Sequence, residues 1–483
     1  MVIKFKKTAQ IAVLFFLATI PILFGAVHPI ITGLYTFSIY SLLGSWLIVN
    51  KKQFPVFHIS SLGIISFSLF ILSVAFSTVP LPLAWIQVIS PARFAYIQAA
   101  NQLSSTNIQY APLSHHPNAG ILFFTFLIAL VLYALTLLIL LKNDQAFLKK
   151  VLYTCSIIGL FEAMYGLVQV TNPEMGVLWL NDIKQFKGMA RGTIIYKNQY
   201  AALLNMIWPL TFGTALLYFR GQIHKKHSRS VLSQQPRRRK KKKHSHSQTN
   251  YRLQAYILLF ITSILMLANL FSQSRGGSLS MLLILFILLI IIPGGYQKKI
   301  FLTSTLLLIS IFYGSIIGFT NIFERFMLIQ QSGEIRLNIW FSSLPMLYDY
   351  IFLGAGIGSY ITLSPIYLKF FPENLAFDHA HNDYLELAIE LGLPLAVFFF
   401  CVFLVIFSRT IKKIWPYTKT SLTHLPSSAI IALVSAAALI GFLVHGTVDF
   451  GWRLPANLLY ATTLISLLQH GAQATEHLLH NKN

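Results

Sequence analysis

Charged residues are scarce in this sequence of 483 residues. Asp, Glu, Lys and Arg together make up only 11% of it, whereas a soluble globular domain carries about 25%. Acidic residues are the rarest of these, with 14 Asp and Glu against 37 Lys and Arg and a formal net charge of +23. Together with a hydrophobic content of 55%, this composition excludes an ordinary soluble domain and indicates a polytopic membrane protein.

Several motifs that indicate particular kinds of chemistry are also missing. The aspartates form no Asp-x-Asp pair, a spacing that Mg²⁺-dependent transferases often use to hold their metal. No P-loop occurs, so the sequence has no motif for the ATP hydrolysis that would drive transport. The only two cysteines, Cys155 and Cys401, lie inside apolar stretches and predict no disulfide framework. We therefore expect neither a nucleotide nor another cofactor.

Long apolar stretches predict an all-α fold with about twelve transmembrane helices, since a span needs roughly 20 apolar residues. Basic clusters fall in alternate connections on the side of the N-terminus, and the positive-inside bias makes that side cytoplasmic. The predicted spans cover residues 9–27, 30–49, 59–79, 119–141, 149–170, 199–219, 252–272, 277–293, 300–320, 382–408, 427–446 and 454–470.

This pattern divides the chain into an N-terminal transmembrane bundle (1–320), a large, partly helical external loop (321–381) and C-terminal transmembrane helices (382–483). Within the first region, the connection 220–252 contains an unbroken basic run from Arg237 to Lys243. Such a run repels itself, and it predicts a disordered cytoplasmic loop near anionic lipid headgroups. No aromatic residues are interleaved for base stacking, so we expect no nucleic-acid partner.

The stretch 377–397, FDHAHNDYLELAIELGLPLAV, places polar residues directly before an apolar helical pattern. Asp378 or Asn382 suits the cap of that helix, because a short polar side chain accepts from its free N–H groups. His381 is the candidate catalytic base, since an imidazole can accept a proton from a sugar hydroxyl near neutral pH. A capping or otherwise structural histidine is the alternative.

Other polar residues could support His381. His379, Asn382, Asp383 and Glu386 surround it in sequence, and Asp449 of HGTVDFGWRLP could orient a histidine or pair with an arginine. A surface salt bridge is the plainer interpretation of Asp449. Asp378, His379, His381 and Asp383 could also ligate a metal, but neighbours at a helix start seldom point at one ion, so we expect none.

Three arginines lie on the predicted external side, against the charge bias. They are Arg191 in MARGTIIY, Arg275 in SQSRGGSL and Arg336 in GEIRLNIW. Two adjoin glycine, which lets a backbone approach a ligand closely. A guanidinium matches phosphate oxygens with two hydrogen bonds, so the three suit a phosphate carried on a lipid. Arginines that merely anchor helix ends are the alternative.

These motifs together resemble the O-antigen ligase family, which groups lipopolysaccharide O-antigen ligases with O-antigen polymerases and protein O-oligosaccharyltransferases. The resemblance covers about residues 150–460. It is carried by ARGTIIYKNQYAA, SQSRGG, IRLNIW with Pro345 and LGAGIGSY, HAHNDYLELAIELGLP and the weaker HGTVDF.

The resemblance implies a GT-C-type glycosyltransferase of the bacterial inner membrane whose active site faces the periplasm. It would transfer a glycan from undecaprenyl diphosphate to a hydroxyl of lipid A-core, without metal or nucleotide. Arg191, Arg275 and Arg336 would hold the diphosphate and His381 would activate the acceptor, with inversion of the anomeric centre. A polymerase and a protein-directed enzyme are the alternatives within the family. A transporter that uses Glu162, Glu386 and the arginines is the alternative from another class.

Overall fold

The computed structural model describes residues 2–50, 61–104, 107–142, 144–180, 186–232, 242–293, 329–369, 377–420 and 425–480. Over these ranges the chain is almost wholly helical, and the expected all-α architecture is confirmed. The one sheet in them is a short antiparallel pair, β1 (Leu81–Pro82) with β2 (Tyr110–Ala111).

Eight helices within those ranges are long and apolar enough to cross a membrane. The shorter apolar helix α11 (Arg275–Ile291) lies on another predicted span. So do α1 (Val2–Ile22) and α19 (Pro455–His480), whereas the predicted span 300–320 lies outside the described residues. The eight are Pro29–Val49 (α2, Pro29–Ile39, to α3, Ser45–Val49), Ser61–Thr78 (α4), Pro117–Leu141 (α7), Gln145–Thr171 (α8), Lys197–Arg220 in α9 (Lys197–Leu232), Tyr251–Phe271 in α10 (Lys242–Phe271), Leu393–Lys419 with α17 (Leu393–Ile414), and Ser427–His445 (α18).

Helix α9 forms the centre of the bundle. It packs against α8, α10, α11, α18 and α19, and all of its residues from 199 to 216 are buried. Small residues let the neighbouring helices approach closely: a Cβ added to Gly213 would lie 2.8 Å from a methyl carbon of Val434 in α18. The segment that precedes α9 is therefore attached to the most deeply buried helix of the molecule.

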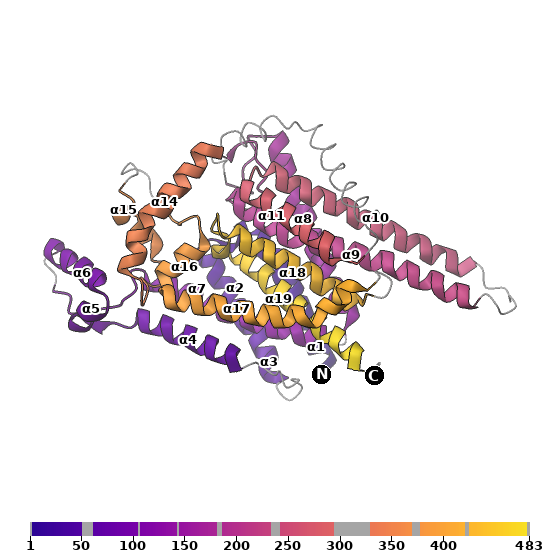
Figure 1. Ribbon diagram of the computed structural model, residues 1–483, viewed down its shortest axis with the longest axis horizontal. Coiled ribbons are helices and arrows are strands. Elements are labelled where there is room, and N and C mark those ends of the chain that lie inside the picture. Colours follow the sequence, from indigo (N-terminus) through magenta and orange to yellow (C-terminus); the bar gives the residue numbers. More distant parts are fainter. Residues whose placement is uncertain are drawn as a thin grey trace.

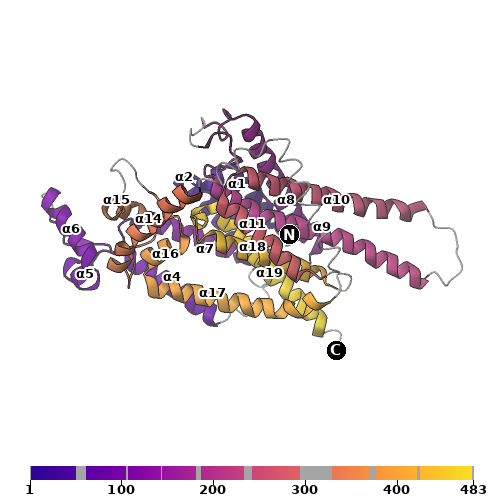
Figure 2. The ribbon, with the colours of Figure 1, turned by 45° about the horizontal axis from the view of Figure 1, so that its top comes forward.

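The two ends of the molecule differ in character. Helices α14 (Ile329–Asp349), α15 (Tyr360–Tyr367) and α16 (Asp383–Leu391) gather at one end, beside α5 (Leu83–Ile89) and α6 (Pro91–Ser104) (Figure 1). Helices α9 and α10 run side by side past the opposite end of the bundle (Figure 2). The external loop predicted at 321–381 is partly helical, as expected.

Helices α9 and α10 continue into the segment 220–252 that was predicted to be a loop. One extends to Leu232 and the other begins at Lys242, while residues 233–241 lie outside the described residues. Hydropathy ends a span where charge begins, but lysine and arginine are good helix formers. The connection between the two helices is therefore shorter than the composition predicted.

The prediction of one continuous span over 382–408 was wrong. The chain breaks at Gly392, which has a φ of +82° and separates α16 from α17. A Cβ at this position would lie 2.4 Å from the carbonyl oxygen of Phe352, so only glycine fits. The N–H groups of Ala355 and Gly356 then donate to the last-turn carbonyls of α16, on Ile389 and Glu390, at 2.9 and 3.0 Å. This short polar helix precedes the apolar helix α17 instead of forming part of it.

Candidate functional site

The candidate site is built around the start of α16. Of the two caps considered, Asn382 is the one observed: its Oδ1 accepts from the N–H groups of Tyr384 and Leu385, both at 3.1 Å. His381 directly precedes the cap and has a φ of +50°, a left-handed conformation that is uncommon for a non-glycine residue. The cap and this backbone turn point the imidazole of His381 away from the helix that follows it.

His381 and His445 lie on either side of one buried carboxylate. His381 Nδ1 is 3.5 Å from Asp449 Oδ1, and His445 Nε2 is 3.6 Å from Asp449 Oδ2. The side chain of Asp449 is 2% exposed, whereas that of His381 is 28% exposed. A hydrogen bond would need a shortening of about 0.5 Å. The arrangement leaves one face of His381 open and aims its other face at a carboxylate.

Two imidazoles and a guanidinium lie near that carboxylate. Burial alone would raise the pKa of Asp449, but His381, His445 and the guanidinium of Arg336 lower it below its ordinary value. Asp449 therefore stays ionised at neutral pH, and it can stabilise a proton on a neighbouring imidazole. The plainer interpretation of Asp449, a surface salt bridge, is excluded by its burial.

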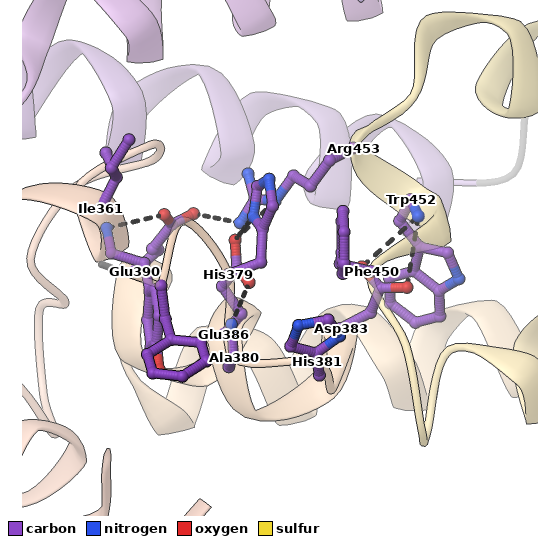
Figure 3. Close-up of polar contacts among 12 residues, drawn as sticks. Ile361, His379, Ala380, His381, Asp383, Glu386, Glu390, Phe450, Trp452 and Arg453 are labelled. Atoms are coloured by element: carbon purple, nitrogen blue, oxygen red, sulfur yellow. Dashed lines mark hydrogen bonds and ion pairs between the residues drawn. The ribbon is translucent and has the colours of Figure 1, made fainter. Parts of the chain in front are cut away.

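A second network fixes the residues before the cap (Figure 3). Glu386 accepts from the N–H of Ala380 at 3.0 Å, and its other oxygen lies 2.9 Å from His379 Nδ1. Arg453 reaches Glu386 with Nε at 3.0 Å and also pairs with Glu390. Burial alone would raise the pKa of Glu386, but His379 and Arg453 lower it to about 2. Residues 377–382, which precede α16, are called the histidine loop. Glu386 thus connects this loop to the chain that follows Asp449.

Asp383 is hydrogen-bonded to backbone groups of the turn at residues 446–452. Its N–H donates to the carbonyl of Gly446 at 2.8 Å, and its carboxylate accepts from the N–H of Trp452 at 3.2 Å. Burial and the nearby charge of Glu386 raise its pKa well above the ordinary value. Asp383 therefore joins α16 to the 446–452 turn and does not face the open side of His381.

Aromatic rings connect the histidines to Arg191. His379 stacks on the ring of Phe450 with centroids 4.4 Å apart, and Phe450 meets Tyr196 edge-to-face at 5.4 Å. Tyr196 in turn contacts Phe186 at 6.0 Å, and the guanidinium of Arg191 lies 5.2 Å over the Phe186 ring. Arg191 is thus joined to the histidine pair by a continuous series of ring contacts.

The motifs of the other two arginines lie near His445 and Ala380. Arg275 is the first residue of α11, and its neighbour Gly276 lies against His445: an added Cβ would come within 3.0 Å of that imidazole. Arg336 lies one turn before Trp340 on α14, and Trp340 Nε1 donates to the carbonyl of Ala380 at 3.0 Å. The fold therefore brings the Arg275 and Arg336 motifs close to His445 and Ala380, and it links Arg191 to His379 through the ring series.

The alternative metal set is not assembled. Within the described ranges no group of three or more His, Cys, Asp or Glu side chains is placed to hold an ion. His379 faces Glu386, His381 faces Asp449, and Asp383 faces the Trp452 backbone. These neighbours in sequence therefore point to different partners.

Sequence reasoning named some of these partners without giving them a role. Arg453, in the same motif as Asp449, entered only as an arginine that Asp449 could pair with, and Phe450 was not singled out. The signal available was their position in HGTVDFGWRLP, which shows a polar turn but not the α16 residues that it meets. Contacts between segments more than 60 residues apart, such as Arg453 with Glu390, have no local signature.

Residues 258–400 match the family model described as O-antigen ligase. The chain carries an O-antigen ligase domain. The matched range includes Arg275, Arg336, His381 and Glu386, whereas Arg191 and Asp449 lie outside it. No curated protein matches the chain. The resemblance to the O-antigen ligase family is thereby confirmed over residues 258–400, whereas the motifs predicted outside that range, ARGTIIYKNQYAA and HGTVDF, are not covered by the match.

Proposed function

We propose that this protein ligates O-antigen to lipid A-core, on a GT-C-type fold in the bacterial inner membrane with its active site toward the periplasm. The donor is a glycan on undecaprenyl diphosphate, and the acceptor is a sugar hydroxyl. The observation that carries the proposal is the contact of the partly exposed His381 with the buried, ionised Asp449 near the three arginine motifs. That grouping supplies a base on one side and phosphate-binding groups on the other.

The proton is handled by His381. Its Nδ1 faces Asp449, so Nε2 is the nitrogen left for the acceptor. As the acceptor oxygen attacks the anomeric carbon, Nε2 takes the hydroxyl proton, and Asp449 stabilises the imidazolium that forms. The bond from the anomeric carbon to the diphosphate oxygen breaks, and undecaprenyl diphosphate leaves with the electron pair. A single displacement of this kind inverts the anomeric centre.

The arginines stabilise the leaving group. Negative charge grows on the diphosphate as its bond to the sugar breaks, and fixed cations placed where that charge develops are often the largest contribution to catalysis. Arg191, Arg275 and Arg336 provide them. Because a diphosphate already leaves readily, the reaction needs neither a strong acid nor a metal.

Transfer by purified protein tests this proposal. The protein in nanodiscs, with no ion gradient, should convert lipid-linked glycan and lipid A-core to ligated product. His381→Ala should lower the rate by about 10²–10⁴-fold, the usual contribution of a general base. His116→Ala, at an exposed histidine outside the site, is the control and should transfer normally. Full transfer by His381→Ala would refute the catalytic assignment, and a requirement for an ion gradient would favour a transporter.

Deletion of the gene separates the family alternatives. A ligase predicts loss of long-chain lipopolysaccharide on gels, with accumulation of lipid-linked polymer. A polymerase predicts lipopolysaccharide that carries a single repeat. Unchanged lipopolysaccharide with loss of glycoproteins would instead identify a protein O-oligosaccharyltransferase.

A further inference from the structure

Two polar side chains of the membrane-spanning helix α8 hold the backbone that carries Arg191. Gln169 Oε1 accepts from the N–H of Arg191 at 3.0 Å, and Gln169 Nε2 donates to the carbonyl of Gly192 at 3.0 Å. Glu162 Oε2 accepts from the N–H of Thr193 at 2.8 Å. Three successive residues of the turn are thus hydrogen-bonded to one helix.

The turn is shaped to fit against Glu162. Gly192 has a φ of +57°, and a Cβ there would lie 2.2 Å from Glu162 Oε2. Both Glu162 and Gln169 are buried, at 0% and 2% exposure, and they lie seven residues apart on the same face of α8. The side chain of Arg191 leaves this turn to lie over Phe186, so the turn sets the direction in which the guanidinium points.

The hydrogen bonds around Thr193 indicate what form Glu162 takes. The Thr193 hydroxyl has one proton but two acceptors in reach, Glu162 Oε1 at 2.7 Å and the carbonyl of Pro21 at 3.0 Å. If Glu162 carries a proton, it donates to the hydroxyl, the hydroxyl donates to Pro21, and every group has its partner. An uncharged carboxyl also suits a side chain that is fully buried in a membrane-spanning helix.

We propose that Glu162 and Gln169 are positioning residues that set the direction of Arg191 through hydrogen bonds alone, with Glu162 uncharged. The effect on transfer rests on the proposed role of Arg191 at the diphosphate, but the effect on the turn does not. The proposal gives Glu162 a task different from a proton or substrate path. In a path its charge would be essential, whereas here a glutamine can replace it: the amide oxygen accepts from Thr193 N–H and the amide NH₂ donates to the hydroxyl.

The test compares Glu162→Gln, Glu162→Ala and Gln169→Ala in the full-length protein in nanodiscs, by amide hydrogen exchange and by glycan transfer. Ser156→Ala is the matched control, because Ser156 is a buried polar residue of α8 that bonds to Thr211 instead. Exchange in the peptide that covers residues 189–196 should be about tenfold faster in Glu162→Ala and Gln169→Ala, the effect of losing one or two buried hydrogen bonds. In Glu162→Gln and Ser156→Ala it should stay at the wild-type rate.

Transfer should follow the same order, with both alanine variants slowed and Glu162→Gln close to wild type. Unchanged exchange in Glu162→Ala would overturn the proposal, and so would a Glu162→Gln variant as impaired as alanine. Arg191→Ala separates this inference from the function. If that variant transfers normally while Glu162→Ala still frees the turn, the positioning stands and the diphosphate role of Arg191 fails.

Discussion

Arg453 shows how the site is held together residue by residue. It lies between the buried carboxylates of Glu386 and Glu390, and desolvation alone would lower its pKa, but the two carboxylates raise it. A buried ion pair of this kind adds little net stability, but removing one partner leaves the other charges buried and unpaired. The loss in the free energy of unfolding on substitution of Arg453 therefore depends on the charges that remain unpaired.

Arg453→Met should destabilise the protein strongly. Loss of one partner of a buried ion pair costs about 3–5 kcal/mol, so the midpoint of thermal unfolding in detergent should fall by several degrees. Lys413→Met is the control: its pair with Glu476, at 2.8 Å, is about 40% exposed on both sides and is worth about 1 kcal/mol at most. Equal midpoints for the two variants would contradict the assigned network.

Arg275→Lys should impair transfer although charge is conserved. An ammonium cannot reproduce the two parallel hydrogen bonds of a guanidinium to a phosphate, and we expect a loss of roughly tenfold or more in kcat/KM for the lipid-linked donor. Arg252→Lys, near the start of the membrane-spanning part of α10, is the comparison. A rate equal to wild type in Arg275→Lys would argue against diphosphate binding at this position.

At the scale of elements, α16 is a short helix fixed by charged side chains rather than by apolar packing alone. Glu386 has a folded-state pKa of about 2, below the ordinary 4.5. A lowered carboxyl pKa means that Glu386 stabilises the fold above about pH 4.5 and that this contribution is lost as the pH falls toward 2. The attachment of the histidine loop is therefore sensitive to acid.

Glu386→Gln should reveal that sensitivity. The variant should melt well below wild type at pH 7, and the gap should narrow as the pH is lowered from 4.5, because the wild type loses the same ionised group. Burial and the charge of Glu386 together raise the pKa of Asp383 and of Glu390, so the difference reports Glu386 and its effect on these two neighbours. Glu174→Gln, which removes an exposed carboxylate, should melt like wild type throughout. A gap that does not depend on pH would contradict the assignment.

Whether a feature of the fold or of the site could be predicted depends on how far apart in the sequence its contacting residues lie. The membrane helices and the Asn382 cap follow from local patterns, and so does the position of the polar motifs at the ends of helices. Hydropathy missed the break at Gly392, although glycine followed by Leu393 and Pro394 is a helix-stop signal. The pairing of Arg453 with Glu386 and the hold of α8 on the Arg191 turn depend on tertiary packing, which single-sequence patterns do not encode.

At the scale of the whole molecule, the far ends of α9 and α10 lie opposite the end where α14, α15 and α16 gather. Figure 1 shows α9 and α10 directed away from α14, α15 and α16. We propose that the basic segment lies at the cytoplasmic surface near anionic headgroups, and the site at the periplasmic surface. Separation of this kind fits the expectation that Lys and Arg are retained inside.

Labelling of introduced cysteines tests that orientation. In a background with Cys155 and Cys401 replaced by alanine, His116→Cys should react with an impermeant maleimide added to spheroplasts. Ser247→Cys should react only after the membrane is opened. Labelling of Ser247→Cys in intact spheroplasts would invert the topology and place the site in the cytoplasm.

The left-handed backbone at His381 offers an experimental opportunity. Asparagine adopts this conformation far more readily than β-branched residues do, for which it costs about 1–2 kcal/mol. An enzyme with His381→Asn should therefore keep its shape and still seat the lipid-linked glycan, yet leave the acceptor unactivated. Such a stalled protein would hold both substrates long enough for their positions to be imaged.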